Sequence, residues 1–181
     1  MKTIDKLPGN LPKGEKRIEK TFQDCMKEER KLIRTRTFVK TSKKFYRTYV
    51  NSAKKALNTA KILLDNEAYE WSIVPAYSAI YQSANAIIVK ELGKECRDHF
   101  CLLITLLKLK KIGFDELKNI ESLRSRLDLL KEEELAFANK IRLVRSTVIY
   151  RPSEKFDEKK IAEYVFKKAQ NFVNKVIEVL E

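Results

Sequence analysis

One segment near the end of the chain gathers side chains that could hold a phosphodiester. It reads Arg142-x-x-Arg145-Ser146-x-x-x-Tyr150-Arg151. At helical spacing Arg142, Ser146 and Tyr150 share one face, and Arg145 lies beside it. Two guanidinium groups, a hydroxyl and a phenol can bind phosphate through charge-assisted hydrogen bonds, and Arg151 adds a further cation. The structural alternative is that the arginines pair with acids on neighbouring helices while Tyr150 packs as a lid, since both residue types are ordinary on helix surfaces.

The histidine and the cysteines offer a second possible chemistry. His99 is the single histidine, and Cys96 and Cys101 lie within a few positions of it. A structural zinc site needs four ligands, and the sequence offers no fourth one here, so we predict neither a metal nor another cofactor. The cysteines, with Cys25 as the third, are predicted to be free thiols in a reducing cytoplasm. His99 either assists proton transfer or is a structural residue at a helix start, with its hydrogen-bonding groups satisfied behind the capping Asp98.

The positive charge is concentrated at the start of the chain. The chain carries a net charge of +13, and its first 50 residues hold 15 basic and 6 acidic side chains. Such asymmetry is typical of an arm that meets a polyanion such as RNA, DNA or an anionic membrane. The alternative is a Lys/Glu-rich surface helix that only keeps a small protein soluble.

Aromatic residues alternate with cations at the end of this basic region. Lys43, Lys44 and Arg47 flank Phe45, and Tyr49 follows four residues later. The three cations are candidate phosphate contacts, and a ring among them could stack on a base. The pairing of Phe45 with Tyr49 at helical spacing favours a different interpretation, in which both rings are core contacts of a helix.

Composition predicts an all-α protein without a membrane span. The chain has 181 residues, of which 44% are hydrophobic and 35% charged, with only 4 Gly and 4 Pro. This is enough apolar material for one packed domain, and too few turn residues for an all-β fold. No apolar run approaches the 18–20 residues that would cross a bilayer, and the N-terminus has no signal-peptide stretch, so we expect a cytoplasmic protein.

Apolar periodicity organises the chain into a basic arm over residues 1–41 and an antiparallel up-down bundle of four to six helices over residues 42–181. Expected caps are Ser42, Gly93 and Asp98. The expected helices cover residues 15–36, 42–66, 68–92, 99–110, 116–131, 132–151 and 157–180.

Two parts of this pattern, read together, resemble the HEPN superfamily (higher eukaryotes and prokaryotes nucleotide-binding), in particular its small stand-alone prokaryotic branch. The first part is AKKALNTAKILL at 53–64 followed by AYEWSIVPAYSAIYQSA at 68–84, similar to the opening helix pair of that family. The second is the segment from Arg145 to Tyr150 with the closing helix that begins near Phe156. His99 also falls where this branch often carries a histidine. The resemblance covers roughly residues 45–181.

The resemblance implies a nuclease motif that this chain matches in part. Nuclease members carry Arg, four to six residues, and then His, and Arg145-Ser146 fits the first half while Tyr150 stands in place of the histidine. A tyrosine with a pKa of about 10 is only about 0.1% ionised at pH 7, which makes it a poor base. Arg142 and Arg145 could lower that pKa, or His99 could supply the missing imidazole if the fold brings it to the same cleft.

Three functions are compatible with the sequence. The first is a metal-independent endoribonuclease or toxin, in which Arg145 clamps phosphate and Tyr150 or His99 aids proton transfer. The second is a non-catalytic module that binds RNA or a nucleotide, helped by the basic arm. The third is a protein-interaction bundle, for example the companion of a minimal nucleotidyltransferase antitoxin. The resemblance also implies a homodimer with the Arg145 helices of two subunits facing across a shared cleft.

Overall fold

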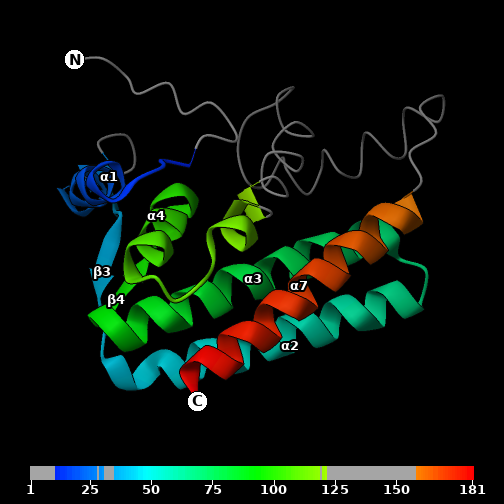
Figure 1. Cartoon of the computed structure of the whole chain (residues 1–181). Coiled ribbons are helices and arrows are strands. Elements are labelled where there is room, and N and C mark those ends of the chain that lie inside the picture. The colour runs from blue at the N-terminus through cyan, green and yellow to red at the C-terminus, as the bar shows by residue number, and fades with distance from the viewer. Residues whose placement is uncertain (1–10, 28, 31–34, 119, 122–157) are drawn as a thin grey trace.

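The computed structural model describes residues 11–27, 29–30, 35–118, 120–121 and 158–181 (Figure 1). Helices dominate, as the composition predicts. The elements with their bounds are α1 (Glu15–Lys27), β1 (Glu29–Arg30), β2 (Thr35–Arg36), β3 (Phe38–Lys40), the 3-10 turn η1 (Lys43–Phe45), α2 (Tyr46–Asp65), α3 (Tyr69–Leu92), β4 (Lys94–Cys96), α4 (His99–Leu109) and α7 (Glu158–Leu180). Residues 114–118 and 120–121 are also helical.

Three long helices form the body of the protein. α2 and α3 are joined by a short turn and run antiparallel, and α7 lies along both of them (Figure 1). Small side chains let the three helices approach closely, because Ala53 of α2, Ala79 of α3 and Val173 of α7 form one fully buried cluster. At the far end, the Lys90 ammonium donates to the Leu180 carbonyl, which joins the C-terminal ends of α3 and α7.

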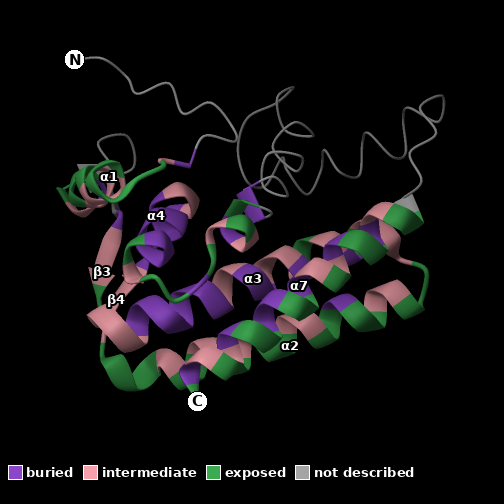
Figure 2. Cartoon of the chain, viewed as in Figure 1, coloured by how far each residue is buried: buried purple, intermediate pink, exposed green. Residues whose placement is uncertain are grey.

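The C-terminal half of α3 is the centre of the core. Every residue of the run 83–89 is buried, and Figure 2 shows this half of the helix enclosed. A helix buried all round must be apolar on most faces, which the broad apolar pattern of the sequence predicts. α3 ends at Gly93 with φ of 62°, a left-handed conformation that glycine adopts without strain, so the predicted C-cap is confirmed.

A short strand and a capped helix follow α3. β4 pairs antiparallel with β3, with Phe38 opposite Cys96. The buried amide of Asn85 fixes this strand, because it accepts from the Cys96 backbone N–H at 2.8 Å and donates to the Cys96 carbonyl at 3.1 Å. The Asp98 carboxylate then accepts from the backbone N–H of Cys101 at 2.9 Å, which confirms the predicted N-cap of α4.

The N-terminal arm differs from its prediction in two ways. Its helix ends at Lys27 rather than Arg36, and residues 29–30 and 35–36 pair as short antiparallel strands. The run Thr35 to Val39 is rich in β-branched and aromatic residues, which favour extended backbone. Cys25 and Cys101 are not free thiols as predicted: they form a disulfide with a Cα–Cα distance of 5.6 Å, whereas Cys96 is buried and outside that disulfide.

The disulfide joins the arm to the bundle. α1 packs against α4, and Leu11, Ile18 and Phe22 contact the main core cluster. The arm helix is therefore docked, a point that the sequence left open. Within the described part of the chain, no helix is both long and apolar enough to cross a membrane.

Candidate nucleic-acid interface

The structure describes four of the predicted site residues. Lys43, Lys44 and Arg47 lie at the junction of η1 and α2, and His99 opens α4. The remaining candidates lie outside the described residues, as does the whole of the expected helix over 132–151; they are Arg142, Arg145, Ser146, Tyr150 and Arg151.

The cations of η1 are held in position by local backbone geometry. The Ser42 hydroxyl accepts from the Lys44 backbone N–H at 3.4 Å, which closes the turn at the N-cap predicted for this residue. Lys43 and Lys44 are both exposed on this turn. Because η1 leads directly into α2, the two ammonium groups project from a turn that is continuous with the bundle.

Arg47 is exposed and has one neighbouring phenol. Its Nε donates to the Tyr46 hydroxyl at 3.3 Å, and its guanidinium carbon lies 5.8 Å from the centre of the Tyr46 ring. This hydrogen bond, aided by the positive charges of Arg47 and Lys90, lowers the pKa of Tyr46. The ammonium of Lys90 lies 5.3 Å from the same ring. The Tyr46 side chain thus restricts the position of the Arg47 guanidinium group, which lies close in the chain to Lys43 and Lys44.

Phe45 is not a core residue, contrary to the prediction from its spacing. Its side chain is 54% exposed, because residues 43–45 form a 3-10 turn and the ring leaves the face on which Tyr49 packs against the core. The ring borders an open hollow of about 290 Å³. Most of the other residues that line this hollow are small and polar, and the lining comprises Thr41, Phe45, Thr48, Tyr49, Ser52 and Gln82.

This arrangement has the parts of a single-stranded nucleic-acid site. An exposed ring offers a face for base stacking, and cations on both sides of it in the sequence can neutralise the flanking phosphates. The hydroxyl groups around the hollow can hydrogen-bond to sugar or base edges. The sequence contained this signal in the alternation of Lys43, Lys44, Phe45 and Arg47, but helical periodicity pointed to burial of the ring.

His99 belongs to a separate cluster of aromatic side chains. Its Nδ1 lies 2.9 Å from the Tyr77 hydroxyl, and the two rings stack with centres 5.5 Å apart. The Tyr81 ring is also close, at 4.7 Å between centres, and its hydroxyl donates to the Cys96 carbonyl at 2.5 Å. Burial is the main cause of a raised pKa at Tyr81, so its phenol stays protonated and structural.

The two tyrosines were not among the predicted site residues. Tyr77 and Tyr81 are four residues apart on α3, so they share a face, and α4 begins opposite that face. The i,i+4 spacing of the two tyrosines is visible in the sequence. The side chain that contacts them is not, because His99 comes from another helix. A half-buried imidazole whose Nδ1 has a phenol partner is oriented, as a histidine used in proton transfer must be.

The cluster of Cys96, His99 and Cys101 does not resemble a metal centre. The Cys101 sulfur is bonded to Cys25, and the Cys96 thiol donates to the Asp98 carbonyl at 3.3 Å. Among the residues that the structure describes, no group of three or more His, Cys, Asp or Glu side chains could hold an ion.

The fold and the site together define a helical bundle. At the start of α2 this bundle presents the exposed Phe45 ring among the cations Lys43, Lys44 and Arg47. A comparison with protein-family models matches residues 46–180 to the HEPN domain, which is most of the chain. The chain therefore belongs to the HEPN family, whose members are known for RNA-related, nuclease-type roles. A comparison with curated proteins found no match.

Proposed function

We propose that this HEPN protein binds single-stranded RNA and cleaves it without a metal ion, as the toxin-type partner of a nucleotidyltransferase. The observation that carries the RNA proposal is the exposed Phe45 ring, flanked in the chain by Lys44 and Arg47 beside an open polar hollow. Family membership supports RNA as the polyanion. Nucleotides share the same phosphate and base chemistry and are the alternative ligand.

The cleavage part of the proposal rests on Arg145, Tyr150 and His99. A base removes the proton of the RNA 2′-hydroxyl, and the 2′-oxygen bonds to the adjacent phosphorus. The bond from phosphorus to the 5′-oxygen breaks, a proton passes to that oxygen, and a 2′,3′-cyclic phosphate remains. Arg145, with Arg142, Ser146 and Arg151 as supporting phosphate contacts, would stabilise the negative charge that develops on the non-bridging phosphoryl oxygens.

His99 is proposed as the proton-transfer group because Tyr150 is a weak base at neutral pH. Tyr77 holds the His99 ring through the 2.9 Å contact at Nδ1. A contact of this kind fixes the orientation of the ring and therefore the direction of the other ring nitrogen. Tyr77 is accordingly proposed as a positioning residue for His99.

The binding site is tested by measuring RNA affinity of Phe45→Ala. Loss of one stacked base weakens binding by about 1–3 kcal/mol, a change of roughly fivefold to over a hundredfold in the dissociation constant. The matched control is Tyr164→Ala, which removes another exposed aromatic side chain near a lysine, on α7. Equal affinities of Phe45→Ala and the wild type would contradict the stacking role.

Cleavage is tested on labelled mixed RNA in the presence of a chelator. We expect cleavage by the wild type and by the control Lys167→Ala, an exposed α7 residue, and intact RNA with Arg145→Ala and His99→Gln. Tyr77→Phe removes only the hydroxyl and should show a smaller reduction, with an altered pH profile. Intact RNA with the wild type would contradict catalysis but not binding.

A second candidate function, protein interaction, is favoured by one end of the bundle. Large apolar side chains are exposed where α2 ends and α3 begins: Ile62 is 53% exposed, Trp71 43% and Val74 47%. Large apolar side chains left exposed at adjacent helix ends can form a protein contact. We propose that a second copy of the chain covers them in a homodimer. Analytical sedimentation should show a dimer for the wild type. The double variant Trp71→Ser/Val74→Ser should be a monomer. A dimer of the double variant would contradict this interface.

A further inference from the structure

We propose that the outward face of α1 is a second RNA-binding surface, formed by Lys16, Lys20 and Lys27, that extends the Phe45 site. The inference rests on the proposed RNA function. At 100° per residue these three lysines lie within about 40° of one another around the helix, over about 16 Å of its axis. A row of this length can contact several successive phosphates of an RNA strand.

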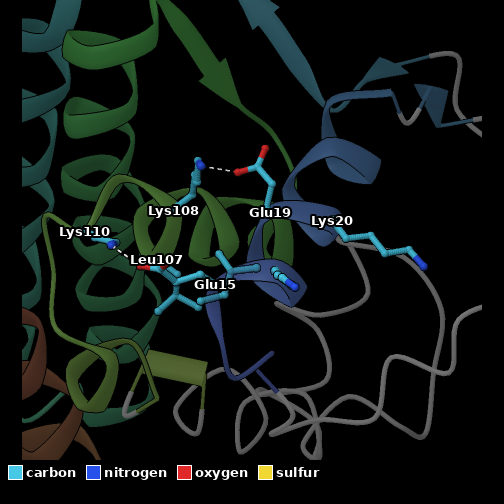
Figure 3. Close-up of a pocket in the computed structure, with 8 residues that line it drawn as sticks. Glu15, Glu19, Lys20, Leu107, Lys108 and Lys110 are labelled. Carbon is cyan, nitrogen blue, oxygen red and sulfur yellow. Dashed lines mark hydrogen bonds and ion pairs between the residues drawn. The ribbon is translucent and has the colours of Figure 1, made fainter.

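The charges of α1 are sorted between its two sides. Two of its three acidic side chains turn toward α4, where Glu15 pairs with Lys110 and Glu19 pairs with Lys108. Figure 3 shows both ion pairs, and it shows the Lys20 side chain directed away from α4. Glu15 and Glu19 therefore neutralise lysines of the bundle instead of the lysines of their own helix.

The outward lysines keep their charge available. Lys16, Lys20 and Lys27 are all exposed, and none of them has an ion-pair partner within the described residues. Arg17 is exposed beside this face and adds to the positive potential, whereas the exposed Asp24 of the same helix reduces it. A row of unneutralised cations on one helix face is suited to a polyanion.

The arm presents this face in a fixed orientation. The Cys25–Cys101 disulfide ties the last turns of α1 to α4, and the Ile18 and Phe22 side chains pack against the core. A docked helix loses less conformational freedom on binding than a free arm would, so more of the electrostatic attraction appears as affinity.

The chemistry of the face favours RNA over a membrane. A helix that lies on a bilayer inserts its apolar side, and in α1 that side is occupied because Ile18, Phe22 and Cys25 face the core. β3, the last of the three short strands between α1 and η1, runs from the arm toward η1 (Figure 1), so the lysine row and the Phe45 site lie beyond its two ends. An RNA strand bound at Phe45 can thus extend along the arm.

The test is the salt dependence of RNA binding by Lys16→Gln/Lys20→Gln/Lys27→Gln. Three lost phosphate contacts on a single strand reduce the slope of log K against log salt by about 2, and weaken binding at about 0.1 M salt by roughly tenfold or more. The matched control is Lys54→Gln/Lys55→Gln/Lys167→Gln, which removes the same charge from exposed positions of α2 and α7. Unchanged thermal unfolding of both variants confirms that the substitutions act at the surface.

The outcomes separate this proposal from the one that it rests on. If the slope of log K against log salt falls for the arm variant but not for the control, the arm face binds RNA. If the wild type and the arm variant bind with the same slope, or the control loses as much, the arm proposal is wrong while the Phe45 site stands. If the wild type binds no RNA but binds vesicles with anionic lipid, both proposals fail.

Discussion

The arm and the three-helix body of this protein are held in different ways. α2, α3 and α7 interlock through small and branched apolar side chains, with Ala53, Ala79 and Val173 in contact. α1 contributes few core residues and is held in addition by one disulfide and by ion pairs near the protein surface. The body depends on packing, which few solution conditions alter, whereas the attachment of the arm depends on redox state, pH and salt.

This difference assigns separate tasks to the two regions. The body can keep the Phe45 site in place whatever the state of the arm helix, because that site lies on η1 and the start of α2. The arm can change how strongly it is docked without unfolding the body. Substitutions in the two regions should therefore have effects of different size and different sensitivity to conditions.

The largest effect is expected in the body, at Ile87. This side chain is fully buried in α3, so Ile87→Ala leaves a cavity and should reduce the free energy of unfolding by about 2–5 kcal/mol. Ile87→Val removes a single methylene group and should reduce it by about 0.5–1.5 kcal/mol. Urea unfolding followed by circular dichroism measures both. Equal effects of the two variants would show that packing volume does not determine stability here.

A smaller effect is expected from the disulfide of the arm. Cys25 and Cys101 are 76 positions apart, so their bond closes a long loop, and its reduction should lower the free energy of unfolding by about 2–4 kcal/mol. Urea unfolding with and without dithiothreitol measures the difference. Cys25→Ser/Cys101→Ser should unfold identically in both conditions, while the control Cys96→Ala should retain the difference. A wild type that is insensitive to the reductant would contradict the bond.

Sequence alone predicts the body well because its signals are local or periodic. The bounds of α3 and α4 follow from Gly93 as a C-cap and Asp98 as an N-cap, and each needs only a neighbouring backbone group. The burial of α3 follows from an apolar pattern on most of its faces. The all-α fold and the family follow from the same features.

The arm and the site were harder to predict because they depend on partners distant in sequence. The disulfide of Cys25 needs a cysteine on α4, and the orientation of His99 needs a tyrosine on α3. Phe45 was assigned to the core because helical spacing cannot reveal that its turn is 3-10 rather than α. The Arg145 and Tyr150 prediction falls outside the described residues and stays a prediction.

The smallest effect is expected from the ion pairs of the arm. The hydrogen bond and charge of Lys110 lower the pKa of Glu15, and hydrogen bonds from Gln23 and Lys108 lower that of Glu19. A carboxyl group whose pKa is lower in the docked state stabilises docking above its undocked pKa. That contribution is lost as the pH falls through the docked value, which here lies below 4.5.

Hydrogen exchange of the α1 amides measures this contribution, in a Cys25→Ser/Cys101→Ser background so that the disulfide does not hold the arm. Glu15→Gln/Glu19→Gln should speed exchange in α1 slightly at neutral pH, because exposed ion pairs contribute little, and the difference should shrink in high salt. As the pH falls through the lowered pKa values of these two carboxyl groups, protonation should remove the same interactions from the parent, and the two proteins should converge. The control Glu163→Gln/Glu178→Gln changes exposed acids of α7 and should leave α1 exchange unchanged at every pH. If Glu15→Gln/Glu19→Gln does not change exchange in α1, Ile18 and Phe22 alone dock the arm. The arm would then be held by apolar packing, as the body is.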